Sequence, residues 1–69
     1  MNLDEERPIV ANSMRMRGGG FVQALGAALS RADSDNTRRI KEAFPEYWEK
    51  YLNLAQGQMA EKEEVNAEL

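Results

Sequence analysis

Two segments of the chain repeat their apolar residues with the period of an α-helix, and this repeat constrains the fold most strongly. In the first segment apolar side chains occupy positions i, i+1, i+4, i+7, i+8 and i+11, namely Phe21, Val22, Leu25, Ala28, Leu29 and Ala32. In the second segment they are Phe44, Trp48, Tyr51, Leu52 and Ala55. The alternation expected of a β-strand is limited to a few residues around Met14 to Arg17. The sequence therefore predicts an all-α fold.

Short breaks separate the expected helices. Three glycines, Gly18 to Gly20, precede the first helix, which is expected to end near Ala32. The residues 33–36 are Asp, Ser, Asp and Asn, whose short side chains accept hydrogen bonds from the free N–H groups that begin a helix. A second helix is therefore expected from about Asn36 to Phe44. Pro45 ends it, because proline lacks a backbone donor, and suits the first position of a third helix.

Small residues flank the apolar face of the first helix: Ala24, Gly26, Ala27 and Ser30. Small side chains let a second helix approach closely. Glycine inside an exposed helix costs up to about 1 kcal/mol relative to alanine. Close packing against another helix is therefore one reason for a glycine at position 26.

Each end of the chain has two interpretations. Residues 1–17 form either a flexible arm or a short helix, with Pro8 suited to the first helical position and Gly18 to the stop. Residues 57–69 are acidic and hold few large apolar groups, which is typical of a helical extension or a disordered tail. The expected architecture is thus a small three-helix domain over residues 18–56 between these two ends.

A chain of 69 residues forms one domain at most. Domains of this size bury only about 60% of the surface that the unfolded chain exposes, so burying more surface against another protein or a copy adds stability. Cations concentrate between Met14 and Lys41, and glutamates predominate from Glu42 onward. Opposite charges favour contact between copies. We therefore expect a homo-oligomer.

Several classes of protein are excluded by composition. The chain contains no cysteine and no histidine, which removes disulfides, thiolate chemistry, histidine metal sites and histidine-activated nucleophiles. No enzyme, cofactor or metal site is expected. The longest uncharged stretch, Gly18 to Ser30, is shorter than the about 20 residues that cross a bilayer. Acidic residues at positions 4–6 oppose a signal peptide. We expect no membrane contact and a cytoplasmic location.

The stretch "FPEYWEKY" holds four of the five aromatic residues of the chain. Tyr and Trp are frequent in interfaces because they bury a large area and keep a polar end. Tyr47 lies about 100° round the helix from Trp48. We therefore expect Tyr47, with Leu54 at i+7, at a partner-binding surface. Trp48 is a candidate for the same surface and for the core.

Two arginine pairs are candidates for anion or nucleic-acid contact. Arg15 and Arg17 precede the glycines, where free N–H groups begin a helix. Arg38 and Arg39 follow Asp35 by three and four residues, so ion pairs within the helix are the alternative. A phosphate-binding loop needs a strand before its glycines and a lysine after them, and the sequence offers neither. A chain break is the favoured interpretation of the glycines.

The block "GGGFVQALGAALSRADSDNTRRIKEAFPEYWEKY", Gly18 to Tyr51, resembles short proteins of unknown function encoded in bacteriophage and prophage genomes. Their pattern joins a Gly-Gly pair, Phe-Val, an Ala-Leu helix, an Ala-Asp turn with an Asn, Phe-Pro-Glu and a Tyr. The matching positions are Gly19, Gly20, Phe21, Val22, Ala24, Leu25, Ala32, Asp33, Asn36, Phe44, Pro45, Glu46 and Tyr51. The resemblance implies a phage origin and assigns no catalytic or binding residue.

Together these features predict a small phage accessory protein that acts by protein binding in the host cytoplasm. Its expected partners are a second copy and a host or phage protein, and inhibition of a host or anti-phage defence process is a task that the phage resemblance implies. Two alternatives stay open. One is a nucleic-acid-associated protein using Arg15, Arg17, Arg38 and Arg39, and the other is a small virion or assembly component.

Overall fold

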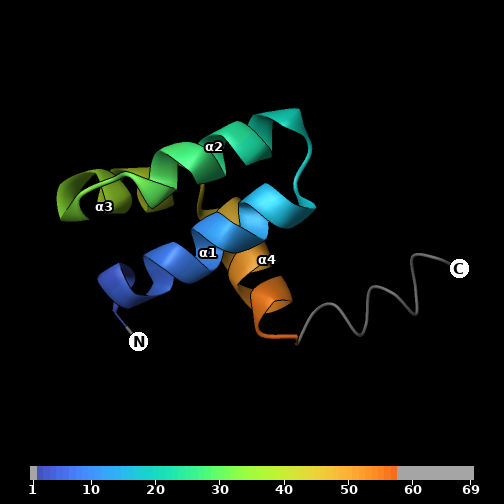
Figure 1. The fold of residues 1–69 in the computed structure, drawn as a ribbon. Coiled ribbons are helices and arrows are strands. Elements are labelled where there is room, and N and C mark those ends of the chain that lie inside the picture. Colours follow the sequence, from blue (N-terminus) through green and yellow to red (C-terminus); the bar gives the residue numbers. More distant parts are fainter. Residues whose placement is uncertain (1, 58–69) are drawn as a thin grey trace, which may run out of the picture.

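The computed structural model describes residues 2–57, and that range folds into four α-helices without a strand (Figure 1). They are α1 (Leu3–Arg17), α2 (Gly20–Ser30), α3 (Ser34–Ala43) and α4 (Pro45–Ala55). The prediction of an all-α fold is confirmed. The acidic extension predicted for residues 57–69 lies outside the described residues from position 58 onward.

The N-terminal segment is helical and ends at Gly18, which agrees with one of its two predicted interpretations, but the helix is longer than expected. It forms α1, which at 15 residues is the longest described helix, so the domain has four helices where three were expected. A capping box begins it: Asn2 Oδ1 accepts the Glu5 N–H at 2.9 Å, and Glu5 Oε1 accepts the Asn2 N–H at 3.2 Å. Pro8 lies inside the helix and not at its first position.

The most extensive contact among the described helices joins α1 to α2, which run antiparallel side by side (Figure 1). A Cβ atom on Gly26 would lie 2.8 Å from Met14 Cβ and 2.9 Å from the carbonyl oxygen of Ala11. Ala11 and Met14 are 1% and 0% exposed. The absence of a side chain at position 26 therefore lets the two backbones meet, as the small residues of the sequence indicated.

The connection between α1 and α2 begins at Gly18, where there is no room for a side chain. The Gly18 N–H donates to the Met14 carbonyl at 2.9 Å and ends α1, and Gly19 caps α2. A Cβ on Gly18 would lie 2.7 Å from that carbonyl oxygen and would overlap the side chain of Val22. A helix, not a strand, precedes the glycines. The interpretation of the glycines as a chain break is confirmed.

Helix α4 also packs against α1, crossing behind it in Figure 1, and begins at Pro45, as predicted. Trp48 is 0% exposed, and its indole Nε1–H donates to Glu6 Oε1 at 2.8 Å. The hydrogen bond satisfies the one polar atom of an otherwise apolar buried side chain. Trp48 belongs to the core, together with Val10, Leu29 and Tyr51.

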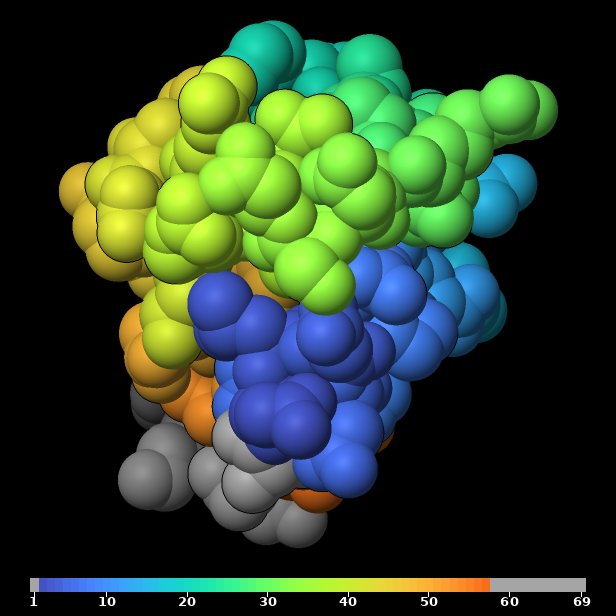
Figure 2. Space-filling model, turned by 90° about the vertical axis from the view of Figure 1, so that its left-hand side faces the viewer, coloured from blue at the N-terminus to red at the C-terminus, as the bar shows by residue number. Residues whose placement is uncertain are grey.

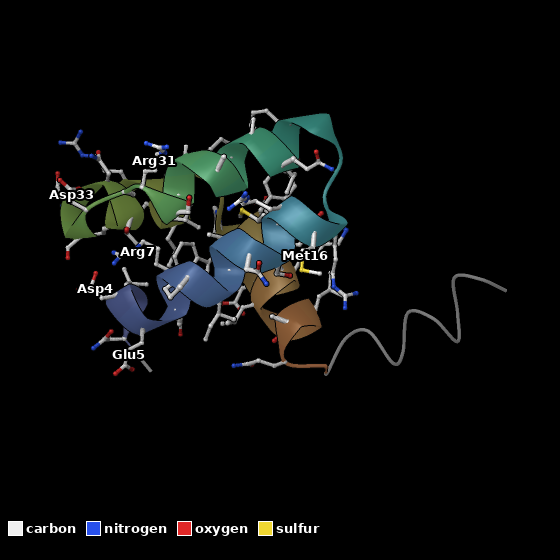
Figure 3. All side chains as sticks on the ribbon, viewed as in Figure 1. Asp4, Glu5, Arg7, Met16, Arg31 and Asp33 are labelled. Atoms are coloured by element: carbon white, nitrogen blue, oxygen red, sulfur yellow. The ribbon has the colours of Figure 1, made fainter. Side chains whose placement is uncertain are left out.

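Helix α3 is attached to the N-terminal half of α1 largely by polar contacts. Asp33 caps it, so α3 begins at Ser34, two residues before the predicted start. Thr37 is fully buried, donates to the Asp33 carbonyl at 2.7 Å and accepts from Arg7 Nη1 at 3.2 Å. Ser34 Oγ donates to Asp4 Oδ1 at 2.8 Å. Figure 2 shows α3 resting on the start of α1, and Figure 3 shows Asp4 and Arg7 near α3.

We predict that Gly26→Ala lowers the free energy of unfolding by about 1–3 kcal/mol, because the added methyl group must push two packed helices apart. Urea unfolding followed by circular dichroism measures the change. Gly20→Ala is the matched control, since a Cβ there meets nothing within 4 Å and alanine favours the helix. Equal stability of the two variants would contradict the close approach at Gly26.

We also predict that Glu6→Ala lowers the free energy of unfolding by about 1–3 kcal/mol, because the buried indole N–H loses its acceptor. Glu6→Gln keeps a side-chain oxygen and should stay near the wild type. A double-mutant cycle with Trp48→Phe, measured by thermal or urea unfolding, isolates the pair. No coupling between the two positions would show that the hydrogen bond does not contribute to stability.

Candidate functional site

Four aromatic rings form a continuous cluster where α2 meets the start of α4. We call Phe21, Phe44, Tyr47 and Tyr51 the aromatic cluster. The Phe21 and Phe44 ring centroids are 5.8 Å apart, and Phe44 stacks on Tyr47 at 5.8 Å with 20° between the planes. The centroids of Tyr47 and Tyr51 are 6.4 Å apart. Such offset and edge contacts fix the rings relative to one another.

The aromatic cluster runs from the core to the surface. Tyr51 is only 6% exposed, Phe44 and Tyr47 are half-buried, and Phe21 is 59% exposed. The helical repeat groups Phe21 with Val22 and Leu29 on one apolar face and so predicts that it is buried, and the structure shows that this prediction is wrong. An exposed Phe held by two neighbouring rings is unusual among the described residues, in which only Met16 is another strongly exposed large apolar side chain.

The exposure of Phe21 follows from the way α2 is turned. Its buried residues are Val22, Gly26 and Leu29, which is the side that meets α1. Phe21 and Ala28 are exposed and lie about 100° round the helix from that side. The apolar stripe of α2 is therefore wider than the surface that the core covers. The width of the stripe is the sequence signal that could have indicated a surface function.

A groove continues from the aromatic cluster between α2 and α3. This α2–α3 groove has a volume of about 380 Å³. Its apolar lining comes from Ala28, Ala32, Ile40, Ala43 and Phe44. Its polar lining comes from Arg31, Asn36 and Arg39. Phe44 belongs to both the groove and the aromatic cluster, so the two features form one continuous surface.

The backbone of Phe44 is held from both sides. It is the only residue between α3 and α4, and it ends the first helix and begins the second. Its N–H donates to the Ile40 carbonyl at 2.9 Å, and its own carbonyl accepts the Trp48 N–H at 3.1 Å. The ring at the centre of the candidate surface is therefore attached to two helices and not to a loop.

The predicted partner-binding residues fall into two groups. Tyr47 is half-buried within the aromatic cluster and retains some exposed surface. Trp48 is 0% exposed and Leu54 is 8% exposed, and both belong to the core. The placement of Leu54 beside Tyr47 on an accessible surface was therefore wrong. Phe21, not Leu54, lies next to Tyr47, with ring centroids 6.3 Å apart.

The two arginine pairs lie far apart. Arg15 and Arg17 are in the last turn of α1, whereas Arg38 and Arg39 are on α3, at the other end of the molecule in Figure 1. Arg38 and Arg39 both pair with Asp35, which confirms the ion pairs that the spacing indicated. Arg15 lines a separate polar depression of about 660 Å³ beside the start of α2. The structure does not bring the four cations into one patch.

Comparison of the chain with protein-family models, curated proteins and solved structures gave no match. Within residues 2–57, no group of three or more acidic side chains is arranged to hold a metal ion. In that same range, every helix is too short or too polar to cross a bilayer. The aromatic cluster and the α2–α3 groove together are the candidate functional surface of the described residues.

We predict that Phe21→Ser changes the free energy of unfolding by only about 1 kcal/mol, because the ring is more than half exposed and loses only its contacts with neighbouring rings. Leu29→Ala, on the buried side of the same helix, should cost about 2–5 kcal/mol. Urea unfolding of both variants tests the assignment. A large loss for Phe21→Ser would show that the ring is a core residue.

Proposed function

We propose that this chain is a small binding protein whose contact surface is the aromatic cluster together with the α2–α3 groove. The observation that supports this proposal is the exposure of Phe21, 59% accessible while packed on Phe44 and Tyr47. Aromatic side chains are enriched in protein interfaces because each buries a large area. An exposed aromatic surface beside an apolar groove adds little stability to the isolated domain, whereas a bound partner would bury it.

Preorganisation supports the same proposal. Association costs free energy when side chains must be immobilised. Phe44 is fixed by two helices, and Tyr47 stacks against it, so these rings are ordered before a partner arrives. Little further ordering is needed, and more of the area buried on contact contributes to affinity.

The resemblance to phage-encoded proteins is the basis for the biological part of the proposal. We propose a phage accessory protein in the host cytoplasm that binds a host or phage protein, with inhibition of a defence or host process as its task. Self-association through the exposed aromatic cluster belongs to the proposal. A nucleic-acid role is less favoured, because Arg38 and Arg39 lie on α3, far from Arg15 and Arg17 at the end of α1, so the four cations do not form one patch.

We predict that Phe21→Ser reduces partner binding at least tenfold while far-UV circular dichroism stays unchanged, because hot-spot aromatic residues account for a large share of binding energy. The measurement combines sedimentation of the purified chain with affinity capture from a bacterial lysate, followed by quantitative binding to the captured protein. Met16→Ser is the matched control, since Met16 is 72% exposed and lies outside the aromatic cluster.

Equal loss of binding in the two variants would show that general surface hydrophobicity, and not the aromatic cluster, is responsible. A wild-type chain that stays monomeric and captures no protein would overturn the proposed function.

A further inference from the structure

The residues that line the α2–α3 groove suit the binding of a helix. Ala28 and Ala32 line it from α2, Ile40 and Ala43 line it from α3, and Phe44 lies where α3 ends. Alanine methyl groups project little from a helix, so a segment in the groove approaches both backbones closely. A lining of this kind suits the apolar face of an amphipathic helix, whose anchors recur at i, i+3, i+4 and i+7.

The charges of the groove have one sign. Its lining includes two cations, Arg31 and Arg39, and no carboxylate. Among residues 2–57, Arg31 has no acidic group within ion-pair distance. Arg39 Nε is 3.4 Å from Asp35 Oδ2, and its side chain is 70% exposed, so it keeps donors available. Complementary charge favours an anionic occupant.

We propose that the α2–α3 groove binds an acidic amphipathic helix of a partner protein. The apolar face of that helix contacts Ala28, Ile40 and Phe44, while carboxylates on its flank pair with Arg31 and Arg39. This inference rests on the proposed function, since it specifies the chemistry of the partner that the surface receives. Carboxylates suit arginine because the guanidinium group can donate two parallel hydrogen bonds to them.

The lining of the groove distinguishes this occupant from nucleic acid. A phosphate backbone is held by several cations and polar groups along its length. Five of the eight lining residues are apolar, and the three polar ones are Arg31, Asn36 and Arg39. Such a surface matches a ligand that is apolar on one side and acidic at its edge, which an amphipathic helix provides.

The test uses the full-length chain and a displayed library of peptides of about 15 residues, a length at which isolated helices begin to form. The library has an alanine-rich template with one randomised face. We expect selected peptides to combine apolar residues at helical spacing with flanking Asp or Glu. Synthetic versions are then titrated against the chain by fluorescence anisotropy at two salt concentrations, and binding should weaken as salt rises.

Substitutions locate the peptide. Arg31→Gln and Arg39→Gln should each weaken binding about 2–5-fold, the range expected for exposed ion pairs. Ala28→Gln, which fills the groove from an exposed helical position, should weaken binding at least tenfold. Arg15→Gln is the matched control, because it removes the same charge from the far end of α1 and should leave binding unchanged.

Selected peptides that lack acidic residues, an empty selection, or binding insensitive to Ala28→Gln would overturn this inference. So would a dimer that Ala28→Gln dissociates, since a second copy would then occupy the groove. Tighter peptide binding after Glu61→Gln, Glu63→Gln and Glu64→Gln would identify the acidic end of this chain as the occupant and would also overturn it. If Phe21→Ser still abolishes partner capture in any of these cases, the proposed function is retained and only the proposal of an acidic helix in the groove is rejected.

Discussion

The backbones of α1 and α2 can meet only because residue 26 has no side chain, and α1 is the helix that every other described helix contacts. With Gly26 against Ala11 and Met14, α2 presents Val22 and Leu29 to the interior. Helix α4 also packs against α1, and its Trp48 is tied to Glu6. A small domain has little apolar area to spare, so a close contact of this kind contributes a large share of its packing.

Helical periodicity and proline were enough to locate α2, α3 and α4, and Pro45 begins α4 as expected. The N-terminal helix was underestimated because its apolar residues are few and Pro8 resembled a starting point. The capping pair of Asn2 and Glu5 was visible in the sequence and is the stronger sign of where α1 begins. Its contribution to the core could not be predicted, because that depends on the partner surface of α2.

The candidate surface was harder to predict than the helices. A helical repeat shows which side of a helix is apolar, but it does not show which part of that side is covered by a neighbouring helix. In α2 the covered side is turned toward Gly26, which leaves Phe21 and Ala28 outside. In α4 the buried residues are Trp48, Tyr51 and Leu54. The covered side of this helix is therefore turned away from Leu52 and toward Leu54. Tertiary contacts determine how each helix is turned about its axis, and the spacing of apolar residues in the sequence does not specify that rotation.

The position of Phe44 between α3 and α4 limits how this protein can adjust to what it meets. A ring on a long loop can swing to suit many shapes, whereas the ring of Phe44 shares its backbone with two helices. Moving the backbone of Phe44 would shift the start of α4 and disturb the interior around Trp48. A partner of the proposed surface would therefore have to adapt its own shape to the fixed backbone of Phe44, and new specificities would arise in evolution by exchanging side chains on the existing helices.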